Sequence, residues 1–238
     1  MKPTDRIFVA LDTPDVDKAR ELVDSLTGLV GGIKIGKEFF MANGPAGVVS
    51  LSQGGMPVFL DLKFHDIPNT VAGAVRAVAP LNPLILNVHA SGGATMMTAA
   101  LAAATEAAKQ CGGIKPLLIG VTVLTSLGDQ DLSTMGIAGT AEEQVLRLAK
   151  ISQSCGLDGV VCSAREITAL RDACGDGFKL VVPGIRPDWA AANDQKRVVT
   201  PFDAVKMGAD YLVIGRPITS AADPVDAAKR IADELANI

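Results

Sequence analysis

Short apolar runs recur along the chain and alternate with segments that have helical periodicity. The runs are rich in Val, Ile and Leu, which is typical of strands buried on both faces. They are Ile7–Leu11, Gly32–Ile35, Val58–Leu62, Leu84–Val88, Leu117–Val121, Gly159–Cys162, Lys179–Val182 and Tyr211–Ile214. The helical segments are Val16–Leu26, Thr70–Val78, Ala94–Lys109, Glu142–Cys155, Ala164–Cys174 and Pro224–Ala236. Strands that alternate with helices predict parallel βαβ units.

Eight such units in 238 residues predict an α/β protein with a single-domain (β/α)8 TIM barrel over residues 1–238. No Pro/Ser-rich linker or shift in composition divides the chain. The alternative is an open, doubly wound sheet. Its usual GxGxxG fingerprint is absent, because the first strand runs into Asp12-Thr13-Pro14-Asp15.

Two connections are longer than a strand-to-helix turn requires. They are Leu124–Ala141, after the fifth strand, and Pro183–Val199, after the seventh. Long loops in a compact domain are often functional, and on a barrel both would lie at the C-terminal face, where active sites are built. We expect residues 184–198 to form a lid that closes over a phosphate.

The composition narrows the choice of partners and compartment. The chain is 48% apolar and 20% charged, has a net charge of −4 and contains no basic run, so we expect no nucleic-acid partner. We see no signal peptide and no apolar run long enough to span a membrane. Cys111, Cys155, Cys162 and Cys174 form no CxxC pair, which favours reduced thiols over a zinc or redox site. A cytoplasmic protein is expected.

The third strand carries charges inside an apolar run. Side chains on a strand alternate faces, so Phe59, Asp61 and Lys63 should point into the barrel, with the charged pair near its rim. Asp66 follows in the loop, beside His65, which we interpret as a packing or loop residue without a chemical function. A Lys–Asp pair at about 4 Å is attractive by about 4 kcal/mol at an effective dielectric of 20. The alternative interpretation is an ion pair that only stabilises the barrel.

Polar residues recur at the same height on neighbouring strands. They are Asp12, Lys34, His89 and Thr125-Ser126. Each has an ordinary alternative: Asp12 could cap the first helix, Lys34 could reach solvent, His89 could be structural, and the last two could be turn residues. Together, however, they predict a ring of polar groups around one mouth of the barrel, which indicates an active site.

The eighth strand ends in Gly215-Arg216. On this fold the loops after strands seven and eight usually bind phosphate, and Arg adds charge-assisted hydrogen bonds. Arg186 and Gln195, in the long loop after the seventh strand, could fold over the same phosphate. These residues predict a phosphorylated substrate, although Arg216 could instead lie on a solvated loop.

The chain resembles bacterial orotidine 5'-monophosphate decarboxylases over essentially its whole length. The matching segments run in order along the sequence: FVALD, KIGKEFF, FLDLKFHDIPNT, NVHASGG, VTVLTS, VVPGIRP and LVIGRPIT. A DxKxxD motif alone marks a wider group of barrel enzymes. The FHDIPNT extension, the VLTS run and the PGIRP entrance to the lid are more specific.

The resemblance implies decarboxylation of orotidine 5'-monophosphate to uridine 5'-monophosphate, in the biosynthesis of that nucleotide. It implies that Lys63 donates a proton to C6 of the pyrimidine and that Asp61 stands beside the substrate carboxylate. Lys34 would link Asp61 to the ribose. Asp66 and Thr70 would cross a homodimer interface to the neighbouring site.

The resemblance also assigns the remaining contacts with the substrate. Asp12 would bind ribose hydroxyls, and Thr125-Ser126 would contact the pyrimidine. Phosphate and lid contacts would come from Pro183, Arg186, Gln195, Gly215 and Arg216. Members of the family are homodimers that use no metal and no organic cofactor.

Two other functions stay open. Related barrels such as keto-gulonate-phosphate decarboxylase and hexulose-phosphate synthase share the DxK motif but need Mg²⁺ held by acidic residues. Here a lysine stands between the carboxylates. A non-catalytic nucleotide-binding barrel is the other possibility, but a binding protein gains little from burying the charges of Lys34, Asp61, Lys63 and Asp66.

Overall fold

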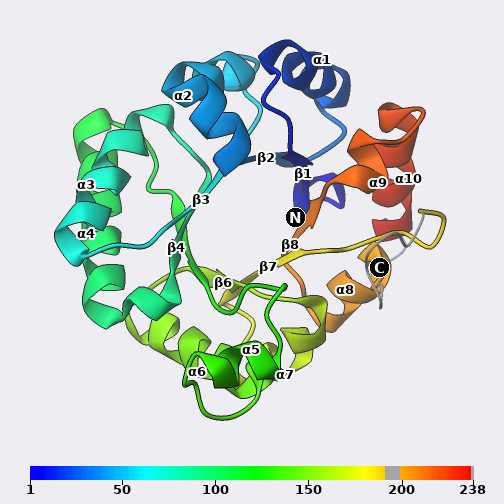
Figure 1. Cartoon of the computed structure of the whole chain (residues 1–238). Helices are drawn as coiled ribbons and strands as arrows, with labels where there is room; N and C mark the ends of the chain where they lie inside the picture. The colour runs from blue at the N-terminus through cyan, green and yellow to red at the C-terminus, as the bar shows by residue number, and fades with distance from the viewer. Residues whose placement is uncertain (191–198, 237–238) are drawn as a thin grey trace.

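The computed structural model describes residues 1–190 and 199–236, and within them parallel strands close into one eight-stranded barrel, seen along its axis in Figure 1. The strands are β1 (Ile7–Leu11), β2 (Gly32–Gly36), β3 (Val58–Phe64), β4 (Ile85–His89), β5 (Leu117–Val121), β6 (Gly159–Val161), β7 (Lys179–Pro183) and β8 (Tyr211–Ile214). Each pairs with the next, and β8 pairs with β1 to close the ring. The predicted (β/α)8 barrel is confirmed, and the doubly wound sheet is wrong.

Helices surround the barrel (Figure 1). They are α1 (Val16–Leu26), α2 (Lys37–Ser52), α3 (Pro68–Val78), α4 (Ala94–Cys111), α5 (Asp129–Thr134), α6 (Ala141–Ser154), α7 (Ile167–Cys174), α8 (Pro201–Met207), α9 (Arg216–Thr219) and α10 (Pro224–Leu235). Short 3-10 turns lie at Thr4–Arg6, Ala79–Leu81, Ala90–Gly92 and Ala164–Glu166. Side-chain caps begin α1, α6, α8 and α10. At α6, for example, the Thr140 hydroxyl accepts a hydrogen bond from Glu143 N–H, and the Glu143 carboxylate accepts one from Thr140 N–H.

Some helices are not predicted by the sequence pattern. One of them is α2, after the second strand, which contains Pro45 and bends at Gly44, whose φ is 59°. Apolar residues along α2 follow no clear helical period, so periodicity could not find it. The long connection after β5, predicted as a loop, contains the short helix α5.

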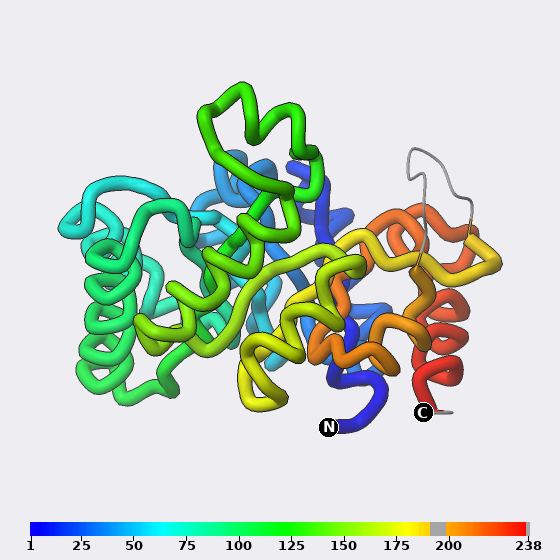
Figure 2. Tube along the Cα trace, turned by 90° about the horizontal axis from the view of Figure 1, so that it is seen from below, coloured from blue at the N-terminus to red at the C-terminus, as the bar shows by residue number. Residues whose placement is uncertain are grey.

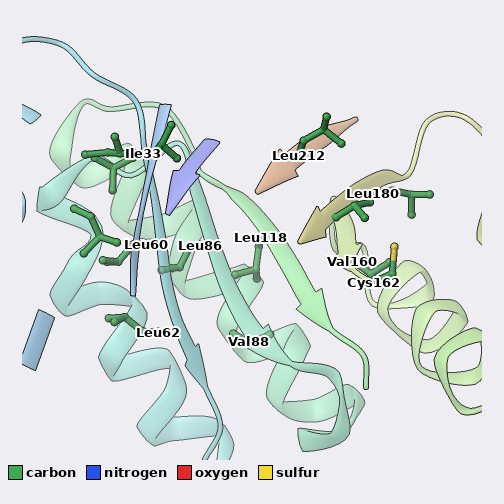
Figure 3. Packing of buried hydrophobic residues seen from close by; sticks show 14 of the residues in the cluster. Ile33, Leu60, Leu62, Leu86, Val88, Leu118, Val160, Cys162, Leu180 and Leu212 are labelled. Atoms are coloured by element: carbon green, nitrogen blue, oxygen red, sulfur yellow. The ribbon is translucent and has the colours of Figure 1, made fainter. Parts of the chain in front are cut away.

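The apolar side chains form two layers. The barrel interior is filled by Phe8, Ala10, Phe59, Ile85, Ile119, Val181, Tyr211 and Val213. The alternate strand residues point outward against the helices, and Figure 3 labels Ile33, Leu60, Leu86, Leu118 and Leu212 among them. As predicted, β3 therefore directs Phe59 and Asp61 inward, while Leu60 and Leu62 pack outside.

The two ends of the barrel differ. Figure 2 shows the segment around α5 projecting from one face, while the N-terminus and the end of α10 lie at the other. The projecting segment follows the carboxyl end of β5, so that face carries the strand-to-helix loops. No helix among the described residues is long and apolar enough to cross a membrane.

Candidate active site

A cavity of about 190 Å³ opens at the carboxyl ends of the strands. One side is charged and the other is apolar. Its lining consists of Lys34, Phe59, Asp61, Lys63, Val121, Val123, Leu124, Thr125, Val161, Cys162, Pro183 and Val213. The site therefore offers fixed charges on one side and an apolar surface on the other, as small-molecule sites commonly do.

Four charged side chains form a row along the polar side of this site. Lys63 Nζ lies 2.5 Å from Asp61 Oδ1, and Asp61 Oδ2 lies 3.4 Å from Lys34 Nζ. Lys34 Nζ also lies 3.5 Å from Asp12 Oδ1. Positive and negative groups alternate, so each inner charge has an opposite charge on both sides.

Asp61 is the most enclosed carboxylate of the row, with 7% of its surface exposed. Burial alone would raise the pKa of this carboxyl. Lys34 and Lys63, together with hydrogen bonds from Lys63 and Asn87, outweigh burial and hold the pKa below its usual value. Asp61 is therefore ionised at neutral pH despite its position inside the barrel.

The backbone is unusual at Lys63. Its φ is 52°, a left-handed value that non-glycine residues seldom adopt. The register between β3 and β4 shifts between Leu60 and Phe64, so the strand is irregular where Lys63 leaves it. Strained residues of this kind concentrate at functional sites.

Asn87 is a member of the site that the sequence analysis missed. It is fully buried on β4, donates from Nδ2 to Asp61 Oδ1 at 2.7 Å, and accepts at Oδ1 from Lys63 N–H at 2.8 Å. A signal was available. Asn87 is two residues after the inward-facing Ile85, so strand alternation places a polar group inside the barrel beside Asp61.

His89 lies at the end of β4 with its ring centroid 5.3 Å from that of His65. Burial, together with the electrostatic effect of the nearby His65, Lys37 and Lys63, lowers the pKa of His89 to about 4. Its ring is therefore neutral at physiological pH, which favours the structural interpretation of His89.

Asp66 and Thr70 do not join the site of their own chain. Both are exposed, and neither lines the cavity. Asp66 Oδ1 accepts a hydrogen bond from Ile67 N–H at 2.6 Å, and within the described residues Asp66 forms no ion pair with Lys63. In a single chain, Asp12 rather than Asp66 is the fourth member of the charged row.

The predicted ribose and pyrimidine contacts are only partly brought to the cavity. Thr125 and Pro183 line it, whereas Ser126 is exposed and does not. Asp12 does not cap the first helix, because that cap is Asp15, which accepts hydrogen bonds from the backbone of residues 17 and 18. The helix-cap alternative for Asp12 is therefore wrong.

Of the predicted phosphate contacts, Gly215 lies beside this row. Gly215 directly follows β8, and a Cβ built on it would lie 3.8 Å from Asp12 Oδ2. Arg216 begins the short helix α9. Arg186 is buried, and its backbone N–H donates to Val199 O at 3.1 Å, which joins the two described ends of the long loop. Gln195 and most of the expected lid lie outside the described residues.

Comparisons with known proteins identify the family of this chain. The sequence profile of the Orotidine 5'-phosphate decarboxylase / HUMPS family matches residues 5–231. The chain belongs to this family. The orotidine 5'-phosphate decarboxylase of Rhodospirillum rubrum is 58% identical over 96% of this chain and 93% of its own length. That of Moorella thermoacetica is 52% identical over 99% of this chain and 94% of its own.

A solved structure of the same family has the same fold. The crystal structure of orotidine 5'-phosphate decarboxylase from Lactobacillus acidophilus matches with a TM-score of 0.86 at 38% identity. The match covers 96% of this chain and 98% of that one. The family resemblance predicted from the sequence motifs is confirmed.

Proposed function

We propose that the protein is a carboxy-lyase that converts orotidine 5'-monophosphate to uridine 5'-monophosphate and CO2 in pyrimidine nucleotide biosynthesis. One observation supports this proposal more strongly than the others. Lys63 holds its ammonium 2.5 Å from the buried, ionised Asp61 at the mouth of a half-apolar cavity. The 58% identity to a protein named orotidine 5'-phosphate decarboxylase supplies the substrate.

The reaction needs a stabilised carbanion and a proton. When the bond between C6 and the carboxylate breaks, its electron pair stays on C6 as CO2 leaves. The ammonium of Lys63 then donates a proton to C6 and becomes a neutral amine, which regains a proton from water. A fixed ammonium stabilises charge that develops only near the transition state, and it does so without reorganising solvent.

Asp61 has two functions in this scheme. Its carboxylate holds the Lys63 ammonium in place, and it would face the carboxylate of the substrate. Lys34 and Lys63 keep Asp61 ionised, so it would repel the substrate carboxylate and favour departure as neutral CO2. Ground-state repulsion of this kind is a contested source of catalysis.

The remaining predicted contacts would hold the ribose, base and phosphate. In this proposal Asp12 and Lys34 bind the ribose, and Thr125, Ser126 and Pro183 contact the base. The phosphate contacts are Arg186, Gln195, Gly215 and Arg216. Binding energy gained at the phosphate, far from C6, would be used to organise the loop and the reacting groups.

We propose further that the protein acts as a homodimer. Asp66 and Thr70 are exposed and reach no part of their own cavity, which supports a function in the site of the neighbouring subunit.

The proposed reaction uses no metal and no organic cofactor. Asp12 and Asp61, the carboxylates nearest the cavity, are each already paired with a lysine. No group of three His, Cys, Asp or Glu side chains within the described residues is arranged to hold a metal ion. These observations favour lysine chemistry over the Mg²⁺-dependent relatives.

Turnover with and without a chelator tests this function against its alternatives. The purified protein is incubated with orotidine 5'-monophosphate and EDTA, and loss of substrate is followed by ultraviolet absorbance. We expect full activity. Activity that appears only with added Mg²⁺ would favour the metal-dependent relatives, and tight binding of uridine 5'-monophosphate without turnover would favour a binding protein.

A further inference from the structure

Asn87 is a fully buried amide in the interior of the barrel. It lies on β4 between Ile85, which packs in the apolar interior, and His89 at the strand end. A buried amide is costly unless its hydrogen bonds are made, so its partners indicate why it is there.

Its two polar atoms bind two different parts of β3. Oδ1 accepts from Lys63 N–H at 2.8 Å, and Nδ2 donates to Asp61 Oδ1 at 2.7 Å. The chemistry fixes this orientation, because a backbone N–H needs an acceptor and a carboxylate needs a donor. Neither an acid in its ionised form nor an apolar residue of the same size could satisfy both partners.

The bond to Lys63 coincides with the irregularity of β3. The β3–β4 register is interrupted between Leu60 and Phe64, and Lys63 has a left-handed φ of 52°. Asn87 supplies the acceptor for the Lys63 N–H at this interruption. The unusual conformation that directs the lysine into the cavity is therefore stabilised by a side chain rather than by a strand ladder.

We propose that Asn87 is a positioning residue that fixes the Lys63 ammonium and the Asp61 carboxylate relative to each other. The Asn87 amide is hydrogen-bonded both to the backbone of Lys63 and to the carboxylate of Asp61. Asn87 does not line the cavity and would act only through these two residues. The inference rests on the proposed function for its consequence in catalysis, but not for the two hydrogen bonds.

Asn87→Leu removes both hydrogen bonds at similar volume. Ser152→Ala is a matched control, because Ser152 is also fully buried and donates to Leu148 O at 2.8 Å, but on the outer helix α6. We expect kcat of Asn87→Leu to fall by about 100-fold, as for loss of preorganised geometry, with KM changed by less than about threefold. Ser152→Ala should change thermal stability but not kcat.

The pH dependence of kcat in Asn87→Asp distinguishes a positioning function of residue 87 from a packing function. A protonated acid can donate to Asp61 while its carbonyl oxygen accepts from Lys63 N–H, whereas the ionised form repels Asp61. The other charged groups nearby are Lys63 and Lys34, which both pair with Asp61. His89, on the same strand, is titratable but neutral at physiological pH, and the β5 neighbour Ile119 is apolar. We expect kcat of Asn87→Asp, relative to wild type, to rise as pH falls.

Hydrogen exchange of the Lys63 amide, measured by NMR, tests the hydrogen bond from Lys63 N–H to Asn87 without any substrate. We expect slow exchange in the wild type and in Ser152→Ala, and faster exchange in Asn87→Leu, or in Asn87→Asp at neutral pH if the leucine variant does not fold. Unchanged exchange together with a kcat within threefold of wild type would overturn the inference. If wild type itself does not turn over, the proposed function fails, and the exchange data alone decide the function of Asn87.

Discussion

At the scale of single residues, the site is governed by how charges inside the barrel are neutralised. Asp61 has 7% of its surface exposed, yet it stays ionised because lysines lie on both sides of it. Removing one member of such a buried pair leaves an uncompensated charge, which is far more costly than the pair is stabilising. The row of charges therefore acts as one unit.

His89 gives a pH prediction at the same scale. Its pKa in the folded protein is about 4, against an ordinary value of 6.5. Below about pH 6.5 the unfolded chain binds a proton at this residue that the folded chain does not bind until about pH 4. Stability should therefore fall as pH decreases through this window, by at most about 3 kcal/mol from His89.

Urea unfolding of wild type and His89→Gln, at one protein concentration across this window, measures the effect. We expect the variant to lose less stability than wild type on going to acid. An equal loss in both proteins would mean that His89 does not hold a neutral ring in the fold.

Sequence reasoning at this scale was right about residue type and direction. Alternation along the third strand placed Asp61 and Lys63 on the inward face, and both line the cavity. It could not predict the left-handed φ of Lys63 or the hydrogen bonds of Asn87. Both depend on the register of β3 against β4, and a single sequence carries no direct record of register.

At the scale of elements, the strands could be predicted closely and the helices less well. Runs buried on both faces show clearly in the sequence, and the β1, β5 and β8 bounds agree with those predicted. Helix α2 was missed, because Gly44 and Pro45 interrupt it and its apolar residues lack helical period. Packing against the barrel, rather than local preference, holds it in place.

Close approach of β6 and β7 gives a prediction about these elements. Gly159 pairs with Lys179, and a Cβ built on Gly159 would lie 2.1 Å from the backbone oxygen of Lys179. Gly159→Ala should therefore push the two strands apart and cost about 1–3 kcal/mol of stability. Thermal unfolding should show a Tm lowered by about 2–4 °C for each kcal/mol lost.

Gly177→Ala is the matched control, because no atom lies within 4 Å of a Cβ built at that position. Its stability should stay within about 0.5 kcal/mol of wild type. If both alanine variants melt at the wild-type temperature, the β6–β7 approach is less tight than the structure indicates.

At the scale of the whole molecule, the number of strand–helix units was enough to predict a closed barrel. The structure of a single chain does not show contacts that a second chain would make with its site. Asp66 and Thr70 were expected to cross to a partner, and in the single chain both are exposed and away from the cavity. Their assignment stays a prediction.

Hybrid dimers test that assignment. If Asp66 serves the neighbouring site, a dimer of one Lys63→Ala chain and one Asp66→Ala chain has one site with both defects and one intact site. Random exchange of equal amounts should then restore about a quarter of wild-type activity. If Asp66 acts within its own chain, mixing would restore nothing.

The most direct test of the proposed function is the rate of uridine 5'-monophosphate formation by wild type and Lys63→Ala. Lys115→Ala is the control, because Lys115 forms an ion pair with Asp158 at 2.7 Å at the opposite end of the barrel. We expect rapid product formation by wild type and by Lys115→Ala, and none detectable from folded Lys63→Ala. Near-normal turnover by Lys63→Ala would contradict the assignment of Lys63 as the proton donor, and no turnover by wild type would contradict the proposed reaction itself.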